Sequence, residues 1–396
     1  MGVGTILRHR KGFLKSQKGD TVVPMDEIIG RFRQVYPESG TPQIWRAPGR
    51  VNLIGEHTDY NLGFVLPMAI DLACFVATAP NDDGYLRVYS EQLRESSAWP
   101  VDYISGARPR GDWTDRVIGI AWALARRGIA VASQNVLITS TVPLGGGLSS
   151  SAALGVSLTL ALGGFRPPRE VAELAFTAER DFVGVPCGIM DQFAAACGQP
   201  GAAILLDCRS LEWRAVKLPE DVAIVAANTM VRHEHASGGY RSRVEECAAA
   251  SRALGVASLR DANLTDLSAL NGMLLRRARH VVTENSRVAQ FVDAAAQGDV
   301  ETMGRLATES HCSLRDDYEV SCAELDFLVE TALRVPGVAG ARMTGGGFGG
   351  STVNFVHREA VQALESALVD GYRKEWGRTP EIHRCIASAG ASRTIP

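Results

Sequence analysis

The sequence predicts two domains of mixed α and β structure that join near residues 196–201. Its 396 residues are enough for two domains, and 46% hydrophobic with 21% charged residues is typical of a globular protein. A strand, a glycine-rich loop and a helix follow one another in the first half, around Pro143–Leu154. After Gly198 the pattern changes to short strands joined by turns, and several helices follow.

Composition excludes several classes of protein. The net charge of −3 provides no general field for nucleic acid or an anionic membrane surface. The eight cysteines form no C-x-x-C pair, which disfavours a disulfide framework or a zinc site and indicates a reducing cytoplasm. The uncharged stretch Thr139–Phe165 is interrupted by glycines, serines and a proline, so its apolar runs are too short to span a bilayer. We expect a cytoplasmic protein with no nucleic-acid or membrane partner.

Residues 1–22 differ from the rest of the chain. They hold five basic residues against one acid, Asp20, and no apolar core of signal-peptide length. We interpret them as a basic, disordered tail or as an over-long start, with Met25 an alternative first residue. The predicted division is therefore a tail at 1–22, an N-terminal domain at 23–198 and a C-terminal domain at 199–396.

In the N-terminal domain the apolar periodicity predicts both helices and strands. Helices are expected at Met25–Tyr36, Asp112–Arg127 (ended by Gly128), Ser150–Leu162 and Arg166–Gly184. Strands are expected at Ile44–Ile54, Phe64–Pro80, Tyr85–Ser90 and Val136–Val142. The polar stretch Gly55–Gly63 interrupts this apolar pattern, and Cys187–Gly198 is apolar except for Asp191 and Gln192.

The C-terminal domain begins with predicted strands at Ala202–Asp207, Trp213–Leu218 and Val222–Asn228. Helical patterns follow at Arg241–Leu254, Arg277–Ala296, Val300–Cys312, Cys322–Val335 and Glu359–Trp376. Two further strands, Val338–Thr344 and Ser351–His357, flank a second glycine loop at Gly345–Gly350, and a last strand is expected near Glu381–Ala387.

The first glycine loop is a candidate anion site. Gly145, Gly146 and Gly147 let backbone N–H groups turn toward an anion, and the N-terminus of the following helix adds to the same field. Hydroxyls for phosphate or metal come from three serines, Ser149, Ser150 and Ser151. A plain strand-to-helix loop with a serine N-cap is the alternative.

The chain has only five lysines, and none lies near this loop. A Walker A motif, an H-R-D motif and a D-F-G motif are all absent. If phosphate is bound here, the helix end, a metal ion and arginine must balance its charge.

Two acids have unusual settings. Glu179 falls on the edge of the apolar face of its predicted helix, so it is either an ordinary edge residue or a carboxylate turned inward toward a cation. Asp191 lies in apolar surroundings, as either a helix cap or a functional acid. The spacing of His233 and His235 could suggest a metal site, but surface or strand histidines are the favoured interpretation.

Four motifs occur in a fixed order: GRVNLIGEHTDYN at 49–61, PLGGGLSSSAAL at 143–154, GIMDQF at 188–193 and MTGGGFGGS at 343–351. Together they resemble the galactokinase family, which is related to the homoserine, mevalonate and phosphomevalonate kinases. The resemblance covers residues 25–390 without a departure inside the motifs. It implies an α+β two-domain kinase: an N-terminal α/β domain with a mixed sheet and a phosphate loop, a C-terminal α+β domain, and an active site in the cleft between them.

The resemblance also implies roles for individual residues. The sugar would contact Glu56, His57, Thr58, Asp59, Gly188, Asp191 and Tyr240. The nucleotide would contact Ser90, Gly145, Gly146, Gly147, Leu148, Ser149, Ser150 and Ser151. Ser151 and Glu179 would hold Mg²⁺, which prefers a few protein oxygens together with phosphate and water. His57 could instead be a structural loop histidine.

The implied reaction is phosphoryl transfer from ATP, as co-substrate with Mg²⁺, to the anomeric hydroxyl of galactose. Asp191 is the candidate base, and Arg50 would stabilise the transferring group and keep Asp191 ionised. Because such transfer depends mainly on positioning, Asp191 could equally orient the hydroxyl. The alternatives are a kinase for N-acetylgalactosamine or arabinose and a non-catalytic galactose sensor. The oligomeric state does not follow from the sequence, and we expect a monomer.

Overall fold

A computed structural model describes residues 23–232 and 236–394, so the predictions for residues 1–22, His233 and His235 lie outside the described residues. The N-terminal half is built on a six-stranded sheet with the order β13-β1-β3-β6-β4-β5. These strands are β1 (Gln43–Asn52), β3 (Pro67–Pro80), β4 (Tyr85–Ser90), β5 (Glu95–Pro100), β6 (Gln134–Ser140) and β13 (Ser392–Thr394). Only β4 and β6 pair in parallel among these neighbours, so the sheet is mixed, as expected.

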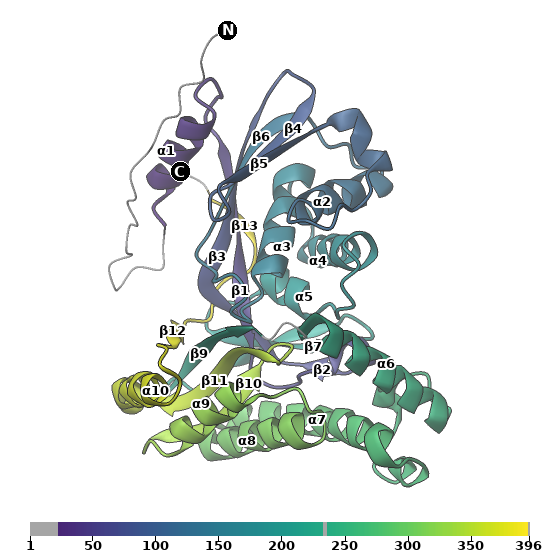
Figure 1. The fold of residues 1–396 in the computed structure, drawn as a ribbon, viewed down its shortest axis with the longest axis vertical. Helices are drawn as coiled ribbons and strands as arrows, with labels where there is room; N and C mark the ends of the chain where they lie inside the picture. Colours follow the sequence, from purple (N-terminus) through teal and green to yellow (C-terminus); the bar gives the residue numbers. More distant parts are fainter. Residues whose placement is uncertain (1–22, 233–235, 395–396) are drawn as a thin grey trace.

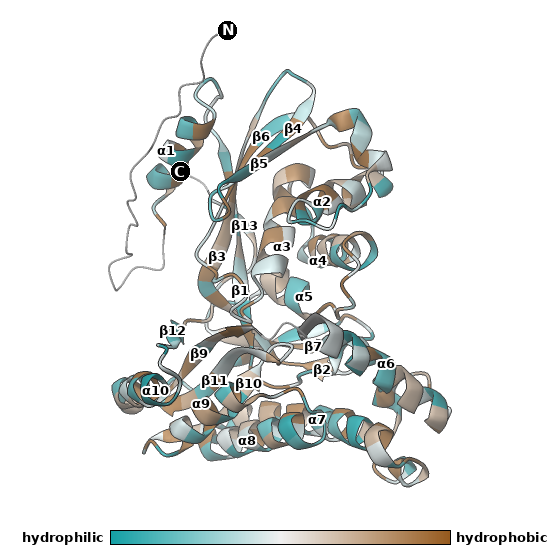
Figure 2. Ribbon diagram, viewed as in Figure 1, coloured by the Kyte–Doolittle hydropathy of each residue, from teal (hydrophilic) through white to brown (hydrophobic). Residues whose placement is uncertain are grey.

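Helices cover both faces of this sheet (Figure 1). One face carries α2 (Asp115–Arg126), α3 (Ser150–Gly163), α4 (Pro168–Thr177) and α5 (Met190–Cys197). The other face carries α1 (Met25–Val35), whose Ile28 and Phe32 are buried against the sheet with Phe75. Helix α3 is apolar around its whole circumference because it is enclosed by the sheet and its neighbouring helices (Figure 2). The loop before α3 is therefore held by a buried helix.

The C-terminal half is built on an antiparallel sheet with the order β10-β11-β9-β12. Its strands are β9 (Val222–Arg232), β10 (Val338–Thr344), β11 (Gly349–His357) and β12 (Glu381–Cys385). The helices of this half are α6 (Ala236–Leu254), α7 (Gly272–Gln297), α8 (Val300–Asp316), α9 (Ala323–Leu333) and α10 (Val361–Trp376). Short 3₁₀ segments occur at Asp59–Asn61, Val101–Gly106, Leu259–Asp261, Asp266–Ala269 and Arg358–Ala360.

The two halves exchange strands. Strand β13, near the end of the chain, pairs with β1 of the N-terminal sheet. A separate three-stranded sheet joins β2 (Phe64–Val65) to β7 (Ala202–Asp207) and β8 (Trp213–Lys217). The division at residue 198 stays a prediction, and these pairings show that the chain crosses between the halves on both sides of it.

Several elements differ from the prediction. Strands β5 and β13 were not predicted, because one is mostly polar and the other has three residues. Helix α6 begins at Ala236 rather than Arg241, which places Tyr240 on the helix. The predicted helix Arg166–Gly184 divides into α4 and a π-helical turn at Ala178–Phe182. No helix among the described residues is long and apolar enough to cross a membrane.

Candidate active site

The first glycine loop connects β6 to α3 and touches both halves of the molecule. Gly147 has a φ of +73°, a conformation that favours glycine, and its carbonyl accepts a hydrogen bond from Arg50 Nη1 at 2.7 Å. At Gly146 a Cβ atom would lie 2.9 Å from the Asn228 side chain, and the Gly146 carbonyl accepts a hydrogen bond from Ser351 Oγ. The loop is therefore held between β1 of the N-terminal sheet and the strands β9 and β11 of the C-terminal sheet.

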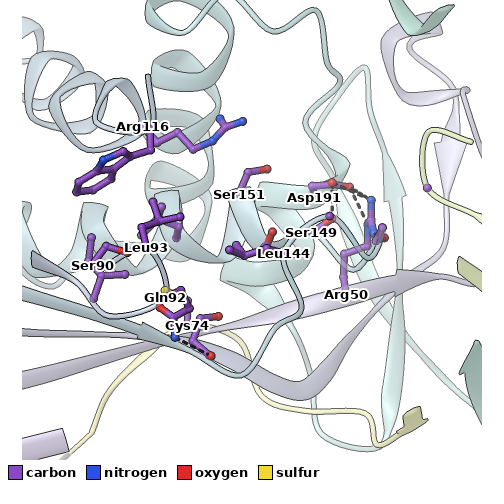
Figure 3. Close-up of a pocket in the computed structure, with 18 of the residues that line it drawn as sticks. Arg50, Cys74, Ser90, Gln92, Leu93, Arg116, Leu144, Ser149, Ser151 and Asp191 are labelled. Carbon is purple, nitrogen blue, oxygen red and sulfur yellow. Dashed lines mark hydrogen bonds and ion pairs between the residues drawn. The ribbon is translucent and has the colours of Figure 1, made fainter. Parts of the chain in front are cut away.

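A cavity of about 460 Å³ opens beside this loop (Figure 3). Six of the eight predicted nucleotide contacts line it: Ser90, Gly145, Gly147, Ser149, Ser150 and Ser151. The other two, Gly146 and Leu148, are not brought to the cavity. The Leu148 side chain is fully buried, and its carbonyl accepts a hydrogen bond from the Arg50 N–H at 3.1 Å. The backbone contacts of Gly146 and Leu148 therefore hold the glycine loop in position.

Sequence reasoning missed other residues of the same wall. They include Cys74, Gln92, Leu93, Trp113, Arg116 and Leu144. Trp113 and Arg116 lie at the start of the predicted helix Asp112–Arg127, and neither belongs to one of the four motifs. Only the folding of α2 against α3 brings them to the glycine loop.

A second cavity of about 200 Å³ adjoins the first. It is lined by the predicted sugar contacts Glu56, His57, Asp59, Gly188, Asp191 and Tyr240. Thr58 is not brought to this cavity. Its side chain is buried, and its hydroxyl donates to the carbonyls of Gly55 at 2.9 Å and Phe64 at 2.6 Å. Thr58 therefore holds the loop that carries its neighbours, and its side chain is not among those that line the cavity.

The titratable groups of the second cavity are strongly perturbed by burial. Burial raises the pKa of Glu56, against the charges of Arg342 and Arg50, and its carboxylate accepts hydrogen bonds from Asn52 and from the Gly345 N–H. Burial, followed by the charge of Asp191, raises the pKa of Asp59 to about 7.

His57 is held neutral in the same wall. Burial lowers its pKa to about 3, and its Nδ1 lies 2.8 Å from the Tyr60 hydroxyl. Its φ of +61° is uncommon outside glycine, and its ring lines the second cavity. A contact between His57 and the sugar stays a prediction.

Arg50 and Asp191 lie where the two cavities meet, because both residues line both cavities. Arg50 Nε is 2.7 Å from Asp191 Oδ1 and Nη2 is 2.8 Å from Oδ2, and Ser149 Oγ also donates to Oδ2 (Figure 3). The N-cap residue of α5 is Ile189, so Asp191 is not a helix cap. A functional role for Asp191 stays a prediction.

The predicted metal ligands, Ser151 and Glu179, line the second cavity together. The π-helical turn adds a residue to the helical repeat at Glu179, and Glu179 accepts a hydrogen bond from Gln192 Nε2 at 2.6 Å. Burial raises its pKa, while the charge of Arg116 and a hydrogen bond to Ser151 oppose that rise. A hydroxyl and a carboxylate beside a phosphate loop fit Mg²⁺. In the described residues, no group of three or more His, Cys, Asp or Glu side chains could hold a metal.

Three family models match the sequence. They are the galactokinase galactose-binding signature over residues 30–80, the GHMP kinase N-terminal domain over 115–199 and the GHMP kinase C-terminal domain over 291–374. The galactokinase of Chloroflexus aggregans is 46% identical over 93% of this chain and 97% of its own length. The chain belongs to the galactokinase family. The galactokinase of Homo sapiens is also 46% identical, over 92% of this chain and 96% of its own length.

Solved structures agree with this assignment. The structure of Lactococcus lactis galactokinase complexed with galactose has a TM-score of 0.88 and 32% identity, and covers 93% of this chain and 100% of that one. The Methanococcus jannaschii mevalonate kinase has a TM-score of 0.66 at 20% identity, covering 88% of this chain and 99% of that one, which shows a shared fold. The predicted α+β two-domain kinase fold is therefore confirmed.

Proposed function

We propose that this member of the family transfers the γ-phosphoryl group of ATP to the anomeric hydroxyl of galactose, giving galactose 1-phosphate and ADP. The observation that carries the proposal is that two cavities meet at one ion pair. The larger is walled by a glycine loop and serines, and the smaller by carboxylates, an imidazole and a phenol, while Arg50 and Asp191 line both. A nucleotide in the first and a sugar in the second would meet at that ion pair.

The smaller cavity has the chemistry of a sugar site. Carboxylates accept charge-assisted hydrogen bonds from sugar hydroxyls, and Glu56, Asp59 and Asp191 all line this cavity. Tyr240 closes another side, with its ring centroid 5.3 Å from that of His57. The solved Lactococcus lactis relative was crystallised with galactose, which supports that sugar as the substrate here.

Asp191 would accept the hydrogen of the anomeric hydroxyl. An ionised carboxylate has about four lone-pair sites. Arg50 occupies one on each oxygen, and Ser149 occupies a second on Oδ2. The remaining site on Oδ1 would take the hydroxyl. The two-pronged contact with Arg50 favours a carboxylate that orients the hydroxyl and can receive its proton as the new bond forms.

Arg50 would stabilise the charge of the transferring phosphoryl group. Its guanidinium has five N–H donors, and three of them are used by Asp191 and the Gly147 carbonyl. The other donors belong to a side chain that is 5% exposed and lines both cavities. In such a site a fixed cation interacts more strongly with developing charge than it would in water.

Ser151 and Glu179 would hold Mg²⁺ in this proposal. A bound Mg²⁺ would neutralise phosphate charge and orient the nucleotide. Glu179 suits that role because it is buried and already faces the Ser151 hydroxyl across the second cavity. We further propose that the protein works in the cytoplasm as a monomer.

A coupled assay of ADP release tests the proposed function. Purified protein with Mg-ATP is offered galactose, N-acetylgalactosamine, arabinose, glucose and, as an unrelated acceptor, mevalonate. Turnover that depends on galactose and exceeds that with the other acceptors is the expected result. Turnover with another sugar and none with galactose would contradict the assignment of galactose as the substrate. A galactose-dependent thermal shift without turnover would overturn catalysis and favour the sensor.

A further inference from the structure

Arg116 stands at the border between the nucleotide cavity and the metal ligands. It is the second residue of α2 and lines the larger cavity together with Ser150 and Ser151. Figure 3 shows its side chain extending from α2 toward Ser151. Arg116 also lines a small cavity with Glu179 and Ser151, so it reaches both proposed metal ligands from the nucleotide side.

One donor nitrogen of Arg116, Nη1, has no hydrogen-bond partner among the described residues. Its Nη1 lies 3.6 Å from Glu179 Oε1, which is beyond hydrogen-bond distance, and the same nitrogen is buried without a hydrogen-bond partner. Arg50, the other cation of the larger cavity wall, has a protein partner on each of its three nitrogens. A buried donor without a partner is costly, so the Nη1 of Arg116 lacks a group that would satisfy it.

Glu179 does not depend on Arg116 for its hydrogen bonds. Gln192 Nε2 donates to Glu179 Oε2 at 2.6 Å, and Ser151 is also hydrogen-bonded to the carboxylate. Arg116 is therefore held near Glu179 mainly by charge. A divalent cation on Glu179 would repel the guanidinium and weaken that attraction.

We propose that Arg116 is a second phosphate-binding cation, which leaves Glu179 and pairs with the phosphates of the nucleotide when a divalent cation binds Glu179. The inference rests on the proposed function and assigns a further contact within the same site. A polyphosphate in the larger cavity carries several negative charges, and no lysine lines that cavity. A guanidinium suits the task because it can form two parallel hydrogen bonds to phosphate oxygens.

The test is the equilibrium binding of ATP, ADP and adenosine, measured by calorimetry without sugar. The variants are Arg116→Gln, Arg116→Lys and, as a matched control, Arg127→Gln at the exposed end of the same helix. With Mg²⁺, Arg116→Gln is expected to weaken ATP binding about tenfold or more and to leave adenosine binding within about twofold. Arg116→Lys should restore part of the loss, because it keeps the charge without the planar pair of donors.

The proposed move of Arg116 from Glu179 to the phosphates can be detected separately, by comparing ATP affinity with and without a divalent cation. In EDTA, Glu179→Gln releases Arg116 from its carboxylate, so metal-free ATP should bind about threefold more tightly or better. With Mg²⁺ the same variant should bind ATP more weakly. The double variant Arg116→Gln/Glu179→Gln should lose the gain seen in EDTA, since the two effects share one contact.

Either of two results would overturn the inference. One is ATP affinity of Arg116→Gln equal to that of Arg127→Gln, with only its unfolding temperature lowered, which would make Arg116 a structural partner of Glu179. The other is a weakening of adenosine binding equal to that of ATP. Both results are separable from failure of the proposed function, which is judged by galactose-dependent turnover of the unsubstituted protein.

Discussion

Arg50 and Asp191 are 141 positions apart in the sequence and form a two-pronged ion pair, with Nε 2.7 Å from Oδ1 and Nη2 2.8 Å from Oδ2. Arg50 belongs to β1 and Asp191 to the first turn of α5. The Arg50 side chain is 5% exposed and that of Asp191 is 28% exposed, so the carboxylate is the partner more open to a ligand. Removing either charge would leave the other poorly compensated, even when the replacement side chain has the same shape.

Asp191→Asn is expected to lower kcat at least about a hundredfold, the low end of general-base contributions. The amide keeps the shape of the carboxylate, so Kd values for ATP and galactose, measured by calorimetry, should change much less. Steady-state kinetics with galactose and Mg-ATP measure kcat. A variant that keeps more than a tenth of the original kcat would show that Asp191 is not the base.

Glu179→Gln is expected to raise the Mg²⁺ concentration needed for half-maximal turnover more than it raises the galactose KM. The substitution removes the charge that would attract the metal and leaves the sugar cavity otherwise unchanged. Titrating Mg²⁺ at saturating galactose, and galactose at saturating Mg²⁺, separates the two effects. The reverse pattern would argue against a metal role.

The contribution of Asp59 to the stability of the sugar-free protein should fall as pH rises from about 4 to about 7. Burial and the nearby Asp191 charge raise the pKa of Asp59 from 3.8 to about 7 in the folded state. Between those values the folded state binds more protons at Asp59 than the unfolded state does, so each rise in pH favours unfolding. Urea unfolding from about pH 5 to about pH 8 measures the slope.

Asp59→Asn is the control for that slope, because the amide does not titrate. It should lose less stability than the unsubstituted protein between about pH 5 and about pH 7. His57 and His280 act in the opposite direction below about pH 6.5, because burial lowers their folded-state pKa values to about 3 and about 4, so the unfolded state binds more protons. Both histidines are present in the two proteins, so the difference between the slopes isolates Asp59. If the free energy of unfolding changed with pH equally in the two proteins, the raised pKa of Asp59 would be contradicted.

Gly188→Ala is expected to raise the galactose KM about tenfold. A Cβ atom at Gly188 would lie 2.0 Å from Asp59 Oδ2, so the carboxylate must move away from its place in the cavity wall. Gly106→Ala is the matched control, because nothing lies within 4 Å of a Cβ atom there. Kinetics at varied galactose measure KM, and an unchanged value in Gly188→Ala would count against Asp59 as a sugar contact.

Thr58→Val is expected to lower the free energy of unfolding by about 1–3 kcal/mol and to leave the galactose KM within about twofold. The buried hydroxyl donates to the Gly55 and Phe64 carbonyls, which the valine would leave without that donor. Thr58→Ser keeps the hydroxyl and should retain most of the stability. A tenfold rise in KM without loss of stability would restore Thr58 as a substrate contact.

Local patterns predicted most of the regular structure. Helix α3 begins at Ser150 as predicted, and β10 has the predicted bounds of Val338–Thr344. These elements have strong apolar patterns and nearby glycines, which act over a few residues. The π-helical turn at Ala178–Phe182 has no such local signal, because it depends on how α4 packs against α2 and α5.

Motifs identified most of the candidate site but not the contacts inside it. Ser149 was predicted to contact the nucleotide, and in the structure its hydroxyl donates to Asp191 while it also lines the larger cavity. Arg116 lies outside the four motifs, and it reaches the cavity only because α2 packs beside α3. Motifs predict residue types at a spacing along the chain, whereas a hydrogen bond depends on distance and direction in space.

The sequence by itself determined the kinase family, the two glycine loops, and Arg50, Asp191 and Glu179 as the residues to examine. These properties follow from residue types at short spacings, which the chain carries before it folds. Only the tertiary structure decided that Arg50 contacts Asp191 through two nitrogens, that the Thr58 hydroxyl bonds to nearby carbonyls instead of lining the cavity, and that the end of the chain returns as β13 to pair with β1. Contacts between distant segments form only when packing brings the segments together, so no local pattern determines them.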